Sequence, residues 1–189
     1  RLDRPHSEIA PWSIWISYSP DLRFWGESQL IMKPEQYHWD EMKIGPGAPP
    51  IKTDKGWLSI YHGVFRTMDG SVYRLGVALH DLLNPAKVIG VSDSWILQPE
   101  DPWEITGYVH NVVFTCGAVA ESDGTVKIYG RRHGHVRGRS ECLRSGRFMP
   151  GFRQTGKMNA PISGTALITH QVTTARSRHG PLADRRSGA

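Results

Sequence analysis

Two pairs of short apolar segments, each joined by a turn that ends in Asp-Gly, constrain the fold of this chain most strongly. The first pair, 56–64 and 72–80, flanks the turn 67–70, and the second pair, 111–120 and 125–129, flanks the turn 121–124. Asp-Gly between apolar runs is the short-range signal of a β-hairpin. Residues 1–130 show no amphipathic pattern of three helical turns. The sequence therefore predicts an all-β chain built from antiparallel hairpins.

The strands also recur with shared flanking residues. Residues 12–19 and 72–80 both end in an Asp-Leu turn, at Asp21 and Asp81, and each is followed by a short apolar strand and a proline, at 30–34 and 95–99. Antiparallel units of about 50 residues that recur in this way are typical of a β-propeller. Two blades and part of a third are visible, whereas propellers have four or more. We therefore expect the C-terminal part of a longer protein.

The net charge of +5 comes entirely from one end of the chain. Residues 1–130 hold 11 Lys and Arg against 16 Asp and Glu, whereas residues 131–189 hold 12 against 2. All seven Trp and all six Tyr lie before residue 131. Two different compositions are joined here, so the average charge indicates neither a nucleic-acid partner nor a membrane partner for the first part.

The location of the protein is read from three weaker features. Cys116 and Cys142 form no disulfide framework or zinc spacing, which favours a reducing compartment. The chain has no apolar run of 18 residues and no signal-peptide core in its first 15 residues. Because it starts at Arg1 rather than Met, the natural N-terminus is expected to be missing. These features predict a cytoplasmic protein with no membrane partner.

The segment 43–51 is the most unusual candidate site. Two Gly and three Pro within six residues predict a stiff connection with no continuous strand pairing. Loops of this kind at an axial end of a propeller hold ligands. An inter-blade linker is the alternative, with Lys43 as a solvated surface cation.

Two histidines lie in or beside predicted strands. His62 lies within the strand 57–64, where a buried histidine of the core is the ordinary interpretation, but Gly63 after it often marks the close approach of a ligand. His110 and Asn111 form a polar pair at the start of the strand 111–120, where they bind a ligand or cap the strand.

The first residues bring Arg1, Asp3 and Arg4 into one short irregular stretch. Arginine binds phosphate or carboxylate oxygens through two parallel hydrogen bonds, so a pocket that holds Arg, Lys and His suits a multiply charged anion. A surface ion pair of Arg4 with Asp3 or Glu8 is the alternative.

Five motifs in order resemble glycoside hydrolase family 130, the β-mannoside phosphorylases. They are RLDRP (1–5), WSIWISYSPDL (12–22), KIGPGAPPI (43–51), IYHGV (60–64) and NVVFTCGAV (111–119). The resemblance covers residues 1 to about 130. It implies a five-bladed β-propeller, of which this chain holds about the last two to three blades.

The resemblance implies the reversible, inverting phosphorolysis of a β-mannosidic bond to α-mannose 1-phosphate. One Asp donates the proton to the glycosidic oxygen, and inorganic phosphate is the nucleophile, unlike the water of an inverting hydrolase. The protein supplies a cationic site that offsets the repulsion between phosphate and the sugar and fixes the in-line geometry. No cofactor or metal beyond the co-substrate phosphate is implied.

The resemblance assigns roles to individual residues. The phosphate site is implied for Arg1, Arg4, Lys43 and His62, and sugar subsites for Asp3, Tyr73, His110, Asn111 and Phe114. His110 departs from the proline usual at its position. The general acid belongs to an Asp-Pro-Arg motif that this sequence lacks, and Asp21, Asp81 and Asp101 lie in other contexts. We assign no catalytic acid and expect this chain alone to be inactive.

The tail 131–189 is interpreted as the product of a frameshift near residue 130. Family members continue there with approximately Gly-Ala-Ala-Asp-Thr-Val-Met-Cys-Val-Gly. Codons can be chosen for residues 131–138 that, read one base later, encode Ala-Asp-Thr-Val-Met-Cys-Val. High charge and few aromatic residues predict disorder for this tail. A basic nucleic-acid arm and a metal site at His133 and His135 are the alternatives.

The predicted function is therefore phosphorolysis of mannosylglucose or short β-1,4-mannooligosaccharides, by a full-length protein that forms homo-oligomers. A hydrolytic β-mannosidase of the same family is one alternative. A carbohydrate-binding propeller without catalysis is another.

Overall fold

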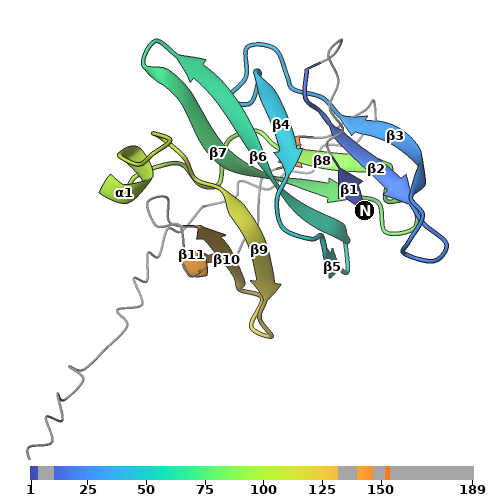
Figure 1. Cartoon of the computed structure of the whole chain (residues 1–189). Helices are drawn as coiled ribbons and strands as arrows, with labels where there is room; N and C mark the ends of the chain where they lie inside the picture. Colours follow the sequence, from blue (N-terminus) through green and yellow to red (C-terminus); the bar gives the residue numbers. More distant parts are fainter. Residues whose placement is uncertain (4–10, 132–139, 147–151, 154–189) are drawn as a thin grey trace, which may run out of the picture.

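The computed structural model describes residues 1–3, 11–131, 140–146 and 152–153 as three antiparallel sheets (Figure 1). The first holds β1 (Leu2–Asp3), β2 (Ile14–Tyr18) and β3 (Gly26–Met32). The second sheet holds β4 (Lys43–Pro46), β5 (Ile51–Thr53), β6 (Gly56–Thr67), β7 (Gly70–His80), β8 (Val88–Ser92) and β12 (Phe152–Arg153). Its strand order is β12-β8-β7-β6-β4, and β5 also pairs with β6. The third holds β9 (Thr115–Ala120), β10 (Val126–Arg131) and β11 (Ser140–Gly146). Within these residues, the helix α1 (Pro102–Ile105) is one turn long, and nothing there could cross a bilayer as a helix.

The predicted hairpins are confirmed. The strands β6 and β7 pair without a break from Trp57↔His80 to Thr67↔Gly70. The strands β9 and β10 pair up to Val126↔Ala120, and the turn between them closes with a hydrogen bond from the Glu121 amide to the Thr125 carbonyl (2.7 Å). The all-β fold predicted from the alternating pattern is thus present.

The long hairpin β6–β7 buries both of its faces. One face contributes Leu58, Ile60, Leu75 and Val77 to a cluster that also contains Val126 and Ile128 of β10. The other face contributes Tyr61 and Ala78 to a cluster with Ile14 of β2, Met32 of β3 and Trp39. Since side chains alternate along a strand, every second residue of β6 faces each neighbouring sheet. The second sheet therefore lies between the other two.

The repeated Asp-Leu turns are confirmed by matching hydrogen bonds. Asp21 Oδ1 accepts from the amides of Arg23 and Phe24, both at 2.9 Å. Asp81 Oδ1 accepts a hydrogen bond from the amide two residues ahead (2.9 Å) and another from the Asn84 amide (2.8 Å). In both turns these amide bonds lower the pKa of the aspartate. The two turns end β2 and β7, so these strands occupy equivalent places in successive units.

The expected interruption of strand pairing within 43–51 is confirmed, but it is confined to residues 47–50. The strand β4 pairs with β6 from Lys43↔Val64 to Pro46↔Tyr61, and β5 pairs with β6 from Ile51↔Leu58. Proline is tolerated here because β4 ends its sheet, where a missing amide removes no pairing with a further strand.

The strand predicted at 95–99 does not form, since Leu97 makes only an isolated bridge to Leu75, and the strand predicted at 111–120 begins at Thr115. The strand β8 pairs only with Ala78 to His80, so the remainder of that edge of β7 is open to other segments. The Leu75 amide donates to the Leu97 carbonyl (2.9 Å), and the Tyr73 amide donates to the Asn111 carbonyl (2.9 Å). Residues 111–113 therefore bond to β7, and strand pairing with β10 begins only at Thr115.

Two strands lie in the segment that composition predicts to be disordered. The strand β11 pairs with β10 from Arg131↔Ser140 to Val126↔Gly146, and β12 pairs with β8. The composition of the tail does not predict these strands. The remaining residues of the tail, with His133 and His135, lie outside the described residues.

Candidate functional site

Lys43 begins β4 and holds its ammonium group between two aromatic rings. It lies opposite Val64 of β6, which in turn lies opposite Tyr73 of β7. The Lys43 Nζ is 4.9 Å from the centroid of the Trp12 ring and 5.1 Å from that of the Tyr73 ring. The Trp12 backbone is fixed because its carbonyl accepts a hydrogen bond from the Ile44 amide (2.9 Å). Cation–π attraction to both rings therefore defines the position of this charge.

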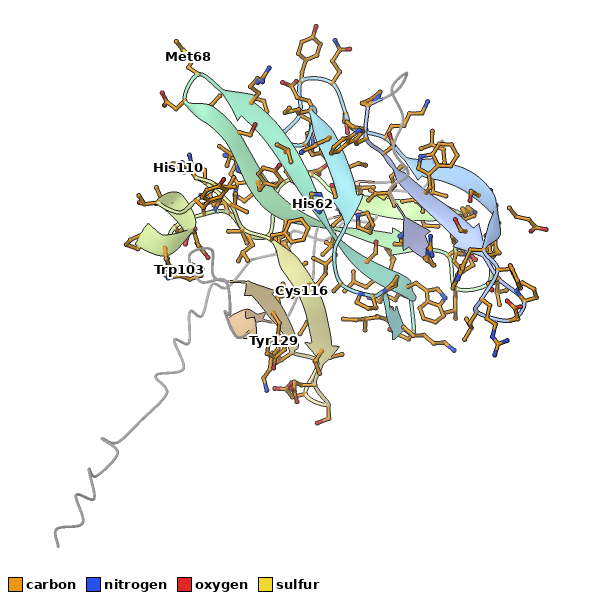
Figure 2. All side chains as sticks on the ribbon, in the orientation of Figure 1. His62, Met68, Trp103, His110, Cys116 and Tyr129 are labelled. Carbon is orange, nitrogen blue, oxygen red and sulfur yellow. The ribbon has the colours of Figure 1, made fainter. Side chains whose placement is uncertain are left out.

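His62 lies on the same face of β6 as Val64, two residues away along the strand. Its side chain is buried, and its ring stacks on Tyr73 with the centroids 6.2 Å apart. The Phe114 ring also packs against the His62 ring, with 4.6 Å between the centroids and an interplanar angle of 42°. Tyr73 therefore touches both His62 and Lys43. We call Trp12, Lys43, His62, Tyr73 and Phe114 the cationic cluster; Figure 2 labels His62.

The loop before β9 carries Phe114 to this cluster. The Tyr73 amide donates to the Asn111 carbonyl, and the Val113 amide donates to the Tyr73 carbonyl (3.3 Å). Asn111 has a positive φ of 57°, a conformation that asparagine adopts more readily than most residues. The hydroxyl of Thr115 then donates to the Tyr129 carbonyl (2.8 Å) and starts the strand pairing of β9.

Gly47 lets the segment after β4 approach this loop. Its amide donates to the Ile60 carbonyl (3.0 Å). A β-carbon at Gly47 would lie 2.6 Å from the Thr115 methyl group and 2.8 Å from the Ile60 carbonyl oxygen. The unusual glycines of 43–51 therefore serve close packing of the backbone against two other elements.

Several residues assigned from the resemblance are not part of the cationic cluster. The Arg1 guanidinium lies 5.0 Å from the centroid of the Trp25 ring, and its terminal amine donates to the Ser17 carbonyl (2.9 Å). Ser17 is at the opposite end of β2 from Trp12, so Arg1 and Lys43 lie apart. His110 is exposed and lies toward α1 in Figure 2. Arg4 lies outside the described residues, and of Asp3 only the backbone is described, opposite Trp15.

Sequence reasoning missed two residues near Lys43. Trp12 precedes Lys43 by 31 residues, so no local pattern in the sequence connects the two. Asp40 belongs to none of the motifs, yet its side chain is buried behind Gly63 on the other face of β6. There its Oδ2 accepts a hydrogen bond from the Tyr61 hydroxyl (3.0 Å), and its Oδ1 lies 2.8 Å from His38 Nδ1.

The cationic cluster combines an ammonium group, an imidazole and three aromatic rings. An ammonium and an imidazole can both donate hydrogen bonds to an anion, and aromatic faces suit the apolar faces of sugars. Asp40 is turned away from this face, and Asp21 and Asp81 are engaged in their turns. Over the described ranges, no three His, Cys, Asp or Glu side chains are grouped so that they could hold a metal ion.

Comparison with known families identifies the class of this chain. The profile of glycoside hydrolase family 130, described as β-1,4-mannooligosaccharide phosphorylase, matches residues 5–136. The chain belongs to this family.

Individual relatives agree with this assignment. A β-1,2-mannobiose phosphorylase of Thermoanaerobacter sp. (strain X514) is 50% identical over 123 residues, 65% of this chain and 40% of the relative. A 1,2-β-oligomannan phosphorylase of the same organism is 45% identical over 117 residues, 62% of this chain and 38% of the relative. The structure of a β-1,2-mannobiose phosphorylase from Listeria innocua with β-1,2-mannobiose has a TM-score of 0.62 at 38% identity, covering 68% of this chain and 35% of that one. The chain thus spans about two fifths of the length of these relatives.

Proposed function

We propose that the whole protein to which these residues belong cleaves β-mannosides with inorganic phosphate, with inversion, and releases α-mannose 1-phosphate. Family membership and the phosphorylase names of the relatives support this. The observation that carries the proposal is the placement of Lys43 and His62 on one face of the sheet, both against Tyr73. A water nucleophile has no need of such a cationic group.

Phosphate binding is the role we propose for Lys43 and His62. A phosphate dianion approaching an electron-rich sugar is repelled, so the site must supply positive charge and hydrogen-bond donors in fixed positions. Lys43 supplies the charge, and the two rings that flank it restrict its movement. Arg4 stays a proposed third member, whereas the position of Arg1 on Trp25 makes it a weaker candidate.

The sugar side of the site is proposed to include Tyr73 and Phe114, with Asp3, His110 and Asn111 as further members. The relatives with the higher identities are named for β-1,2-linked mannosides, whereas the family description names β-1,4 linkages. We propose β-1,2-mannobiose as the first substrate to assay, ahead of the mannosylglucose and β-1,4-mannooligosaccharides expected from the motifs alone.

The fold of the whole protein is proposed to be a five-bladed β-propeller. The matching turns at Asp21 and Asp81 and the stacking of three successive sheets support a repeat of blades. The general acid is proposed to come from elsewhere in the whole protein. No cofactor beyond phosphate is proposed, and cytoplasmic location and homo-oligomeric assembly stay predictions.

A hybrid enzyme tests the activity. This chain is joined behind the N-terminal portion of the Thermoanaerobacter β-1,2-mannobiose phosphorylase and incubated with β-1,2-mannobiose, with and without phosphate. We expect mannose 1-phosphate only when phosphate is present, and no product from the 189-residue chain alone. Free mannose at the same rate without phosphate would instead establish the hydrolase. Saturable sugar binding with no turnover, while the intact relative is active, would establish the binding protein.

A further inference from the structure

A buried hydrogen-bonded group lies directly behind the cationic cluster. Asp40 is 4% exposed, and its Oδ2 accepts a hydrogen bond from the Tyr61 hydroxyl (3.0 Å). Its Oδ1 lies 2.8 Å from His38 Nδ1, and the other ring nitrogen, Nε2, lies 2.7 Å from the Asp93 carbonyl oxygen. We call His38, Asp40 and Tyr61 the clamp. It connects the segment before β4 to β6 and to the residues after β8.

The partners of His38 fix how many protons the clamp holds. A carbonyl oxygen can only accept, so Nε2 must carry a hydrogen to bond Asp93. Nδ1 must then either carry a second hydrogen or accept one from a protonated Asp40 carboxyl group. In both cases His38 and Asp40 share one proton beyond those of a neutral imidazole and a carboxylate. Loss of that proton leaves two acceptors facing each other.

Asp40 packs closely against the backbone of β6 because Gly63 has no side chain. A β-carbon at this position would overlap the Asp40 β-carbon and the Trp39 ring. Trp39 stacks on Tyr61 with their centroids 5.6 Å apart. His62 directly precedes Gly63 and points to the other face of β6. The clamp and the cationic cluster therefore lie on opposite faces of β6.

The clamp also precedes Lys43 directly. The Glu41 amide donates to the His38 carbonyl (3.1 Å), which closes a turn, and the Met42 amide donates to the Val64 carbonyl (3.0 Å), which begins the pairing of β4 with β6. The pair Lys43↔Val64 follows at once. The packing of Asp40 against Tyr61 and Gly63 of β6 therefore determines the residue at which β4 starts.

We propose that Asp40 is a positioning residue for Lys43. Through Tyr61 and His38 it holds the start of β4 in the register that puts the Lys43 ammonium beside Tyr73 and His62. The identity of the ligand of Lys43 rests on the proposed function, whereas the placement of Lys43 by Asp40 does not.

The charged and titratable groups around the clamp come from four elements. Its own segment contributes Glu41, whose carboxylate accepts from the Tyr37 amide. The strand β6 contributes Tyr61, and β7 contributes Arg74, which lies opposite Gly63 with its guanidinium over Trp95. Asp93 follows β8. Burial lowers the pKa of Arg74, which still carries its charge at neutral pH.

NMR of the labelled 189-residue chain tests the proposal without substrate. The experiment follows the Lys43 side-chain signals, which the Trp12 and Tyr73 rings displace, in the unaltered chain and in variants of the clamp.

Substitutions supply the comparison. Asp40→Ala removes both hydrogen bonds that the Asp40 carboxyl group makes, and Tyr61→Phe keeps the ring on Trp39 while removing one of them. We expect most of the ring-induced displacement of the Lys43 signals to be lost in Asp40→Ala and part of it in Tyr61→Phe. Tyr108→Phe, at an exposed tyrosine, is the matched control and should change nothing. Unchanged Lys43 signals in a folded Asp40→Ala chain, or in Tyr61→Phe, would overturn the proposal, whereas a failure to bind phosphate would bear only on the proposed function.

Discussion

The rings of His62 and Phe114 pack against each other with 4.6 Å between their centroids, although His62 lies in the second sheet and Phe114 in the loop before the third. His62 lies within β6, and Phe114 directly precedes β9. This contact closes one side of the cationic cluster and connects two successive units of the fold. His62 and Phe114 are therefore expected to contribute to the stability of the fold as well as to the cationic cluster.

Phe114→Ala is expected to lower the free energy of unfolding by roughly 1 to 2 kcal/mol, because a partly exposed aromatic contact is worth less than a core one. Urea unfolding at neutral pH measures the change. Tyr108→Ala is the control, since Tyr108 is 94% exposed. Equal stability of the two variants would contradict a stabilising contact between Phe114 and His62.

Lys43→Met and His62→Ala in the hybrid enzyme are expected to raise the phosphate concentration needed for half-saturation by about 10- to 100-fold. A charge-assisted hydrogen bond contributes about 1.5 to 3 kcal/mol, which corresponds to that range. The requirement for mannobiose should change much less. Initial rates at varied phosphate measure the effect, with the exposed Lys55→Met as control. Phosphate saturation that is unchanged in both variants would place the anion elsewhere.

Gly47→Ala is expected to destabilise the protein by about 1 to 3 kcal/mol, the usual cost of forcing extra atoms into a packed region. The added carbon would overlap the Ile60 carbonyl oxygen and the Thr115 methyl group. Gly117→Ala is the matched control, because no atom lies within 4 Å of the carbon it would add. Denaturant midpoints compare the two. A midpoint for Gly47→Ala no lower than that of Gly117→Ala would show that the segment 43–51 shifts freely.

His80 is expected to make stability fall on acidification. Burial lowers the pKa of His80, partly offset by its hydrogen bond to the Pro85 carbonyl, and its other ring nitrogen lies 2.8 Å from the Ser59 hydroxyl. The unfolded chain takes up this proton at about pH 6.5 and the folded chain only at lower pH. The stabilisation is therefore complete above about pH 6.5 and is lost as pH falls through the folded pKa.

His80→Gln tests this dependence by comparison with the unaltered chain. Denaturant unfolding at pH 7.5, 6.5 and 5.5 should give a flatter profile for the variant, since glutamine does not titrate. The other histidines titrate equally in both proteins, so the difference isolates His80. Parallel profiles would rule out this contribution.

DNA sequencing around codon 130 tests the frameshift. We expect the genomic reading frame to continue from Gly130 with Ala-Asp-Thr-Val-Met-Cys-Val or a close variant. An intact frame for 131–189 in independent clones would reject this interpretation.

The central hairpin could be predicted from the sequence because its signals are local. The Asp-Gly turn at Gly70 and the apolar runs beside it determine β6 and β7 without reference to the rest of the chain. The Asp-Leu turns are local for the same reason, since Asp21 and Asp81 bond amides two and three residues ahead.

The long-range parts of the site could not be predicted. The Gly-Pro pattern of 43–51 suggests a loop, and its pairing with β6 depends on space that only the folded sheet provides. Residues 111–113 bond to β7 rather than β10 because β8 leaves that edge open. The burial of Asp40 could not be predicted, since its partner Tyr61 lies on β6, 21 residues further along the chain.

Tyr73 touches both Lys43 and His62, and this makes the two proposed ligands thermodynamically linked. A sugar that reorients the Tyr73 ring changes the surroundings of the cation that attracts phosphate. By reciprocity, phosphate then changes the affinity for the sugar by the same factor. The strength of this coupling would depend, in that case, on a single phenol ring.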